Sequence, residues 1–146
     1  EGVADSLSAR TAVFVAPAEF NDTKTNKAVL LEFLVDVRKR FDTVVFEPCE
    51  GWDLDDCDSL AEEADAVVAR DPLVQGLSKR HVAYYRLHGP AGHKSRYEDP
   101  AIERLSEIAA DAGHETATYV FTNVDMFADA KRFKKALKGL YDGEVE

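Results

Sequence analysis

The sequence contains little of what builds secreted or membrane proteins. Among its 146 residues there are two cysteines, Cys49 and Cys57, too few for a disulfide framework. No apolar run approaches the ~20 residues of a membrane span, and no signal-peptide pattern is seen. Basic residues are outnumbered by acidic ones, 18 against 28, which gives a formal net charge of −10. This charge argues against nucleic-acid binding by the molecule as a whole. We therefore expect a cytoplasmic, reduced protein without a membrane segment.

Short β-branched runs alternate with segments of helical periodicity along the whole chain. We expect strands at residues 11–16, 43–47, 66–69, 81–88 and 116–123. We expect helices at residues 26–40, after a cap at Asp53, from a cap at Asp99 to Gly113, and from a cap at Asp125 to Gly143. The link at residues 72–80 is too short for a good crossover helix, and residues 1–10 resemble a loose end or the tail of a preceding helix.

Continuously apolar strands joined by long connections are typical of a parallel sheet covered by helices. With 45% hydrophobic residues, the chain is expected to form a single α/β domain, residues 1–146, with five parallel strands in chain order. A complete (β/α)₈ barrel takes roughly 250 residues, so this length holds about five of its units. The chain is either an open doubly wound sheet or the larger part of a barrel. Because the first residue is Glu1 rather than Met, we expect a processed or cut start.

Three segments carry a family resemblance. They read Val45-Phe46-Glu47-Pro48-Cys49-Glu50-Gly51-Trp52, then Tyr84-Tyr85-Arg86-Leu87-His88-Gly89 followed by Tyr97, then Tyr119-Val120-Phe121-Thr122-Asn123-Val124-Asp125-Met126 followed by Asp129-Ala130 and Arg132-Phe133. In this order they resemble motifs of the YecE-like family, also called domain of unknown function 72. The resemblance implies a partial TIM-like barrel, with this chain supplying the fourth to eighth strands. It names no reaction. Cys49 stands where the family often has Arg, and Thr122 where it often has Asn.

Four polar residues stand at or near the expected carboxyl ends of strands. Strand alternation puts Arg86 and His88 on one face, and Glu47 and Asn123 end two other strands. Because parallel β/α sheets bind ligands at that end, we expect all four in one cup. Arg86 can clamp a phosphate or carboxylate, and Asn123 can hold a substrate oxygen. Glu47 and His88 are the candidates for acid–base catalysis. The alternative is a satisfied polar plug.

Two aromatic residues are further candidates for ligand binding. Trp52 is either a wall of the pocket or a cover on the core. Tyr97 follows the basic loop 92–96, which is either a lid over an anionic ligand or a solvated loop.

Metal and thiol chemistry have weaker support in the sequence. Glu47, Asp71 and His88 stand at strand ends, but no ligand-spacing motif accompanies them, so we predict no metal site. Cys49 has no visible activating cation beside it and is interpreted as a structural thiol. The sequence names no cofactor.

Two function classes stay open. One is binding or processing of a small anionic ligand, phosphorylated or polyhydroxylated, at the strand ends. The other is a non-catalytic half-barrel that assembles with itself or with a partner supplying the missing strands. The outer strands lack charge at residues 13–15 and 119–121, so we expect the chain not to be a lone monomer. The last helix is basic at Lys131, Arg132, Lys134, Lys135 and Lys138. This pattern indicates a solvated face or, alternatively, a nucleic-acid or partner surface.

Overall fold

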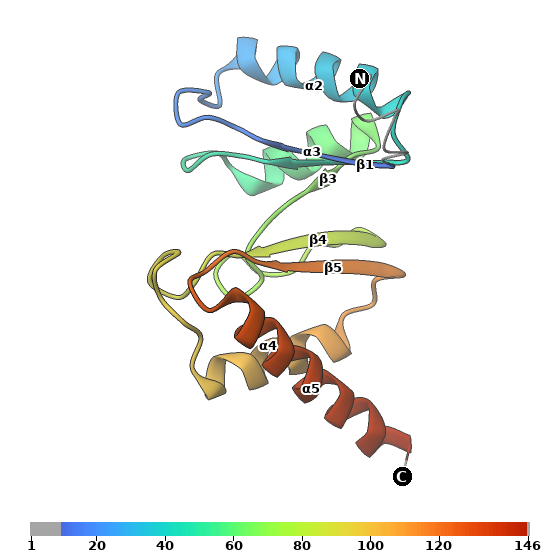
Figure 1. Ribbon diagram of the computed structural model, residues 1–146. Helices are drawn as coiled ribbons and strands as arrows, with labels where there is room; N and C mark the ends of the chain where they lie inside the picture. The colour runs from blue at the N-terminus through green and yellow to red at the C-terminus, as the bar shows by residue number, and fades with distance from the viewer. Residues whose placement is uncertain (1–9, 146) are drawn as a thin grey trace. The chain divides into compact units, whose positions relative to one another are not determined.

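A computed structural model describes residues 10–145, with side chains up to residue 140. It is a mixed α/β structure in which all paired strands are parallel (Figure 1). The elements are β1 (Thr11–Val15), α2 (Lys24–Arg38), β2 (Thr43–Glu47), α3 (Leu54–Ala64), β3 (Val67–Val68), β4 (Val82–Leu87), α4 (Asp99–Asp111), β5 (Thr116–Phe121) and α5 (Met126–Val145). No helix within these described residues is long and apolar enough to cross a membrane. We expected residues 1–10 to form a loose end or the tail of a helix. Apart from Arg10, these residues lie outside the part of the chain that the structure describes.

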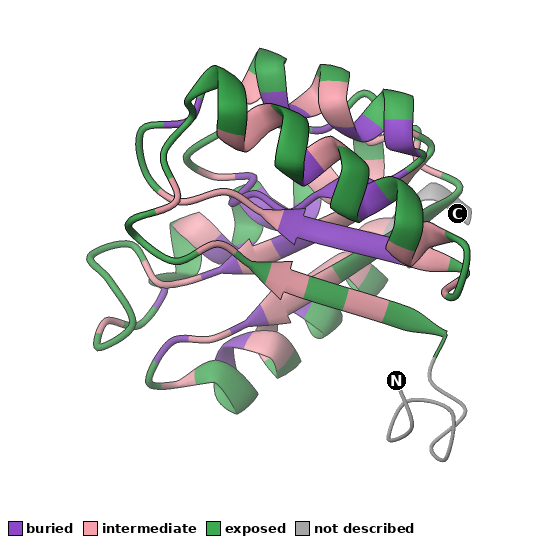
Figure 2. Cartoon of the chain, turned by 90° about the horizontal axis from the view of Figure 1, so that it is seen from above, coloured by how far each residue is buried: buried purple, intermediate pink, exposed green. Residues whose placement is uncertain are grey.

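The chain divides into two compact units, Glu1–Ala69 and Arg70–Glu146, and each is described by itself. The first unit contains a sheet of strand order β1-β2-β3. Helices α2 and α3 pack on one face of it, and the core between them includes Leu34, Phe46 and Ala61. Figure 2 shows β1 banded between exposed and intermediate residues, whereas β2 beside it is mostly buried. Among the described residues β1 pairs with β2 alone, so one edge of the sheet is unpaired.

Side-chain caps fix where the helices of the first unit begin. Thr23 accepts a hydrogen bond of 3.1 Å from the Asn26 N–H at the start of α2. Asp53 accepts one of 3.1 Å from the Asp56 N–H at the start of α3, as the sequence predicted. Helix α3 ends at Asp65, whose φ of 55° is left-handed, a conformation that aspartate tolerates better than most residues.

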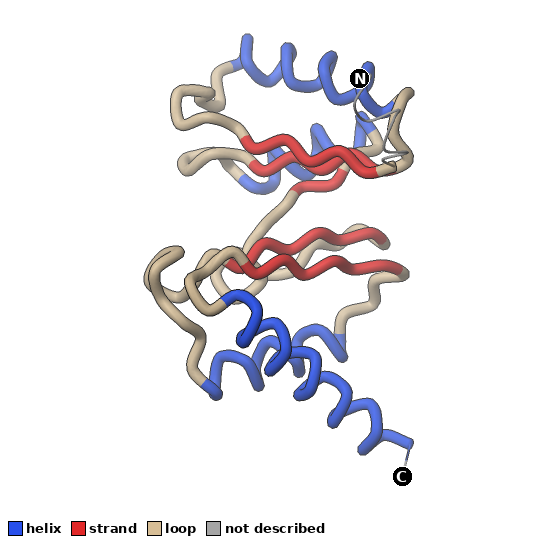
Figure 3. Tube along the Cα trace, viewed as in Figure 1, coloured by secondary structure: helices blue, strands red, loops and turns tan. Residues whose placement is uncertain are grey.

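The second unit contains a two-stranded sheet of β4 and β5, with α4 and α5 on one of its faces (Figure 3). Burial along β4 alternates strictly: Ala83, Tyr85 and Leu87 are buried, and the residues between them are half-buried. This alternation is the predicted one. Leu87 and its strand neighbour Phe121 pack against a stripe of α4 and α5 made of Ile102, Leu105 and Phe133. The helices therefore cover the Leu87 face of β4.

A buried hydrogen-bond chain joins the amino ends of β4 and β5 to the link before β4. The Tyr85 hydroxyl lies 2.7 Å from Nε2 of His114 and accepts from the Ser78 N–H at 3.1 Å. Nδ1 of His114 lies 2.7 Å from the Arg80 carbonyl oxygen. Because that oxygen can only accept, Nδ1 carries the proton and Nε2 accepts from Tyr85. The link that is too short for a helix is thus held by side chains.

The strand predictions are confirmed in type and place, and the strands are parallel within each sheet, whereas one set of five parallel strands stays a prediction. Five strands appear at the expected places, with helices after the first, second, fourth and fifth. In the described part of the chain they form two small sheets and no closed barrel. Strand β3 is shorter than expected, at Val67–Val68, and beyond it Arg70 makes an isolated parallel bridge with Tyr85. The expected single domain stays a prediction.

Several predicted element ends are wrong by a few residues. Asp99 is the first residue of α4 rather than its cap, because its carboxylate pairs with Arg132. Helix α4 ends at Asp111, before the expected Gly113, and α5 continues through Gly143. Helix α2 covers Lys24–Arg38 rather than residues 26–40. Strand β5 ends at Phe121, because the next two side chains bond to groups outside the strand.

Candidate functional site

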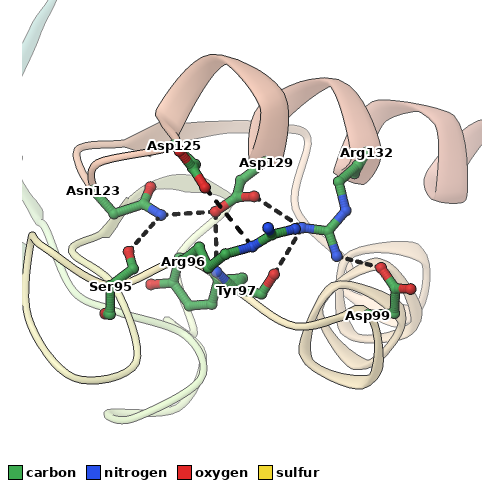
Figure 4. Close-up of polar contacts among 8 residues, drawn as sticks. All are labelled: Ser95, Arg96, Tyr97, Asp99, Asn123, Asp125, Asp129 and Arg132. Atoms are coloured by element: carbon green, nitrogen blue, oxygen red, sulfur yellow. Dashed lines mark hydrogen bonds and ion pairs between the residues drawn. The ribbon is translucent and has the colours of Figure 1, made fainter.

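A buried polar network centred on Asp129 follows the carboxyl end of β5 (Figure 4). Asp129 is fully buried in the first turns of α5. Its Oδ2 accepts from the Tyr97 N–H at 3.0 Å and from Nδ2 of Asn123 at 2.7 Å. Its Oδ1 accepts from Nη1 of Arg132 at 2.8 Å, and Arg132 also donates to the Tyr97 carbonyl oxygen at 2.7 Å. The network therefore fixes the main chain at Tyr97 against α5.

The charge on Asp129 is well compensated. Burial pushes the pKa of Asp129 upward, but the hydrogen bonds from Tyr97, Asn123 and Arg132 outweigh it and lower the pKa. Asn123 also donates to the Ser95 carbonyl oxygen at 3.0 Å. Both neighbours of its amide nitrogen are acceptors, which sets the amide orientation. The Asn123 side chain is committed to this network, although its buried Oδ1 has no partner among the described residues.

A pocket of about 360 Å³ lies next to this network in the second unit. It is lined by Asp71, Leu73, Val74, Pro90, Tyr97, Pro100, Ala101 and Arg104. Three of these residues bring polar chemistry: a buried carboxyl from the segment after β3, a buried phenol from the loop after β4, and an exposed guanidinium from α4. We call this the Asp71–Tyr97 pocket. Its remaining walls are apolar, a composition typical of sites for small molecules.

The Asp71 carboxyl is held by main-chain donors. Its Oδ1 accepts from the Leu73 N–H at 2.9 Å, and the N–H groups of Val74 and His88 also stabilise its charge. Burial nevertheless raises the pKa of Asp71, because these hydrogen bonds and the nearby His88 ring compensate only part of the desolvation. Asp71 can therefore hold a proton to a higher pH than an ordinary aspartate, and can donate it to a ligand.

The Tyr97 phenol is also shaped by burial. Tyr97 is 2% exposed, and its ring lies edge-on against Phe121. Its hydroxyl accepts from the Gly89 N–H at 2.7 Å. Burial raises the pKa of Tyr97 to about 12, and the charges of Asp71 and Asp129 act in the same direction. The phenol therefore stays protonated in any physiological buffer, and its proton is available to an acceptor in the pocket.

A backbone constraint positions the Gly89 donor. Gly89 has a φ of +103°, and a Cβ at this position would lie 2.1 Å from the Gly92 carbonyl oxygen. Only glycine fits this close approach. The loop is further closed by Ser95, whose hydroxyl donates to the Gly92 carbonyl oxygen at 2.6 Å and accepts from the Ala91 N–H at 2.9 Å. Residues 89–95 therefore form a compact, internally bonded turn beside the pocket.

The basic loop proposed as a lid is tied down at both of its ends. Ser95 holds its start, and Arg96 lies 3.7 Å from Asp125 in an exposed ion pair. His93 and Lys94 between them are exposed. The choice between a lid and a solvated loop stays open, but any lid motion would break these contacts.

The predicted site residues of the second unit fall into two groups. Tyr97 and Asn123 meet through Asp129, as described. His88 is half-buried, with Nδ1 2.8 Å from the Thr122 hydroxyl, and its main chain faces the Asp71 carboxyl. Arg86 is half-buried and belongs to the opposite face of β4 from Leu87. The meeting of Arg86, His88 and Asn123 in one cup stays a prediction.

Glu47 and Trp52 belong to the first unit, so their proximity to the other candidates stays a prediction too. Glu47 is the half-buried last residue of β2. Trp52 is buried, stacks on Phe20 with ring centres 5.8 Å apart, and donates to the Phe20 carbonyl oxygen at 2.7 Å. These contacts give Trp52 the role of a cover on the core of its own unit. Cys49 bonds to the same carbonyl oxygen at 3.1 Å.

Among the described residues no group of three or more His, Cys, Asp or Glu side chains could hold a metal ion. Of the residues weighed from the sequence as metal ligands, Glu47 belongs to the first unit, and Asp71 and His88 belong to the second. His88 approaches Asp71 through its main-chain N–H, and Nδ1 of its ring is engaged by Thr122.

The sequence-based hypothesis missed the contributions of Asp71, Arg104 and Asp129 to the site. Asp71 stands two residues after the apolar run 66–69, which is a signal for a strand-end carboxylate, but the sequence suggested it only as a metal ligand. Asp129 lies three residues before Arg132 on a helical face, a spacing that suggests an ordinary surface pair. Arg104 lies on the exposed side of α4, and nothing in its local pattern distinguishes it from a solvated cation.

No family model matches the chain, and no solved structure matches it.

Proposed function

We propose that the Asp71–Tyr97 pocket binds a small anionic ligand that also carries hydroxyl groups, such as a phosphorylated or polyhydroxylated molecule. The observation that carries the proposal is the combination of a buried carboxyl, a protonated phenol and a guanidinium around one pocket with apolar walls. The proposal concerns binding and assigns no reaction to the site.

Arg104 is the group that would take the anion. It is exposed at the pocket and makes no ion pair with a described carboxylate. A guanidinium matches the geometry of phosphate and carboxylate oxygens. Pro100 and Ala101, from the first turn of α4, also line this pocket. The side chain of the cap residue Glu98 makes no hydrogen bond to that turn. The positive end of the helix dipole would add to the attraction.

Asp71 and Tyr97 would recognise the hydroxyl groups. An ionised Asp71 accepts from a ligand hydroxyl, and burial raises the pKa of Asp71 above that of an ordinary aspartate. The Tyr97 hydroxyl offers its proton in addition. Apolar contacts from Leu73, Val74 and Pro90 would cover the ring or carbon chain of the ligand.

We also infer that the two sheets are consecutive portions of a TIM-like barrel of the YecE-like type. Two sheets with purely parallel pairing, and helices after four of the five strands, support this inference. The pocket residues near Gly89 and Asp71 follow the carboxyl ends of strands, where such barrels bind ligands. Sequencing the coding region on both sides of the chain tests it, because opening β/α units are expected nearby. Coding sequence unrelated to β/α units on both sides would argue against it.

The ligand proposal is tested by following the main-chain amide signals of the protein during titration with three probes: inorganic phosphate, a hexose and a hexose phosphate. We expect the hexose phosphate to shift the Asp71, Leu73 and Tyr97 signals at the lowest concentration. Arg104→Gln should weaken its binding roughly tenfold, the typical effect of losing a hydrogen bond to a charged group. Lys79→Gln, which removes an exposed lysine that does not line the pocket, is the matched control and should have no effect.

A different pattern would overturn the proposal. If all three probes shift no pocket signal at millimolar concentration, the pocket is not a site for this chemical class. If Arg104→Gln and Lys79→Gln weaken binding equally, the effect is one of overall charge rather than of the pocket.

A further inference from the structure

In the described part of the first unit, no strand pairs with the outer edge of β1. Even-numbered residues of β1 turn their main chain to β2, as the bond from the Ala16 N–H to the Glu47 carbonyl oxygen shows. Val13 and Val15 therefore turn theirs to the unpaired edge, and their side chains are 40% and 58% exposed. An apolar pocket of about 240 Å³ lies between β1 and α2, lined by Phe14, Phe33 and other apolar residues. We call this surface the β1–α2 groove. An unpaired, uncharged edge beside an apolar pocket is typical of an interaction site.

Helix α2 gives the groove a charge pattern. Val29, Glu32, Phe33 and Asp36 are exposed and spaced at i, i+3, i+4 and i+7, so they share one face of the helix. Val29 and Phe33 also line the apolar pocket. The groove therefore has an apolar part near the start of this face and two carboxylates farther along it.

The second unit carries the opposite pattern on α5. Phe127 near its start is 78% exposed, next to the exposed Val124 and Met126. Farther along α5, Lys131, Lys134, Lys135 and Lys138 are exposed and lie on the side of Phe127. We call this the Phe127–lysine face. Strand β5, which leads into α5, pairs with β4 alone among the described residues and so has an unpaired edge of its own.

We infer that this chain binds a second copy of itself, with the Phe127–lysine face and the β5 edge of one copy against the β1–α2 groove of the other. Val29 and Asp36 are seven residues apart, as are Phe127 and Lys134, so each pair spans about 10 Å along its helix. Phe127 can thus enter the apolar pocket while Lys131 and Lys134 face Glu32 and Asp36.

Strand polarity agrees with this arrangement. If β5 of one copy lies parallel to β1 of the other, α5 and α2 follow their strands on neighbouring units and run in the same direction. The pocket contains residues 14–17, at the carboxyl end of β1, and Phe127 follows the carboxyl end of β5. The aromatic side chain and the pocket therefore lie at the same end of the two strands.

The local charges of α2 and α5, rather than the net charge of the chain, favour a second copy as the occupant. The chain has a net charge of −10, so two copies repel one another at long range. The lysines of α5 form a local basic surface within this acidic chain and complement the carboxylates of α2. At moderate salt, interactions between charges more than ~8 Å apart are largely screened, so the close contacts decide whether the copies bind. The inference is independent of ligand binding in the Asp71–Tyr97 pocket. It concerns the chain without opening β/α units, which would take the same two strand edges in a complete barrel.

A charge exchange between the two surfaces tests the inference by sedimentation at micromolar concentration and moderate salt. We expect the unchanged chain to associate. A chain with Glu32→Lys and Asp36→Lys should associate roughly tenfold more weakly, as should a chain with Lys131→Glu and Lys134→Glu. Because each variant keeps one unchanged surface, an equal mixture of the two should associate again. Phe127→Ser should weaken association roughly thirtyfold, the loss expected of a central contact.

The control variant carries Glu62→Lys and Glu63→Lys, which exchange two exposed carboxylates of α3 for lysines away from the groove. It has the same net charge as the α2 variant and should associate like the unchanged chain or more strongly. The inference is overturned if the unchanged chain sediments as a monomer. It is also overturned if the mixture of variants fails to associate, or if the control is weakened as much as the α2 variant.

Discussion

At the scale of single residues, Asp129 does more than any other side chain to hold the pocket in shape. Its two oxygens accept from the Tyr97 main chain, from Asn123 and from Arg132. The loop between β4 and α4 has no regular structure, so the position of Tyr97 depends on these contacts. A buried carboxylate with this many donors stabilises the fold only while it is ionised.

Asp129→Asn is expected to destabilise the protein by about 1–3 kcal/mol at neutral pH, because the amide nitrogen cannot accept and leaves buried donors unpaired. The folded state lowers the pKa of Asp129, so its contribution is present above the unfolded pKa of about 4 and is lost as the pH falls through the folded value. The stability difference between the two proteins should therefore shrink below about pH 4, as measured by urea unfolding at a series of pH values.

Asp111→Asn is the matched control, because Asp111 is exposed at the end of α4. It should change the stability little at any pH. A difference between Asp129→Asn and the unchanged chain that stays constant down to pH 2 would contradict the proposed role of the ionised carboxylate.

The sequence allowed Tyr97 and Asn123 to be predicted as site residues, because both follow strands in a recognisable motif. Their partners could not be predicted in the same way. The contact between Asn123 and Asp129 depends on how the first turn of α5 folds back, and that between Tyr97 and Asp71 joins segments 26 residues apart in the chain. Local pattern contains no information on such contacts. Trp52 is a case in which a local pattern fitted two roles. An aromatic residue after a strand can cover the core or line a pocket, and only the structure distinguishes the two.

At the scale of secondary-structure elements, the caps make a direct comparison possible. Asp53 caps α3 with its side chain, whereas Glu98 at the same position of α4 makes no side-chain bond to its helix. We expect Asp53→Ala to cost about 1 kcal/mol of stability and Glu98→Ala to cost little. Thermal and urea unfolding of the two variants checks this. An equal loss in both would mean that helix dipole charge, rather than the hydrogen bond, is what matters at these positions.

The helices and strands were predictable because apolar periodicity and the turn residues that follow strands are local signals. The strands at residues 43–47 and 82–87 and the cap at Asp53 follow from such signals. The division into two small sheets was not predictable, because it depends on which strand edges meet. Strand β3 has only two paired residues, and Arg70, two residues after it, bridges to Tyr85. No residue pattern predicts this change of pairing partner.

At the scale of the whole molecule, the excess of acidic residues has a measurable consequence. At about 0.01 M salt the screening length is ~30 Å, so charges repel across a large part of the surface; at about 0.15 M it is ~8 Å. With a net charge of −10, we expect this change of salt to raise the unfolding temperature by roughly 4 °C, corresponding to about 1 kcal/mol. Calorimetry of dilute samples checks this. An equal rise with a non-ionic solute of the same osmolality would contradict an electrostatic cause.

The placement of Trp52 in the core of the first unit gives the chain a natural optical label. It is the single tryptophan, and all five tyrosines, at positions 84, 85, 97, 119 and 141, belong to the second unit. Tryptophan emission excited selectively therefore reports on the surroundings of Phe20 and Phe46, whereas the near-ultraviolet absorbance of tyrosine reports on β4, β5 and the Asp71–Tyr97 pocket. Coincident transitions in the two signals would mean that the units melt as one, and separate transitions that each melts alone. The unfolding of the two units can therefore be followed separately without an attached dye.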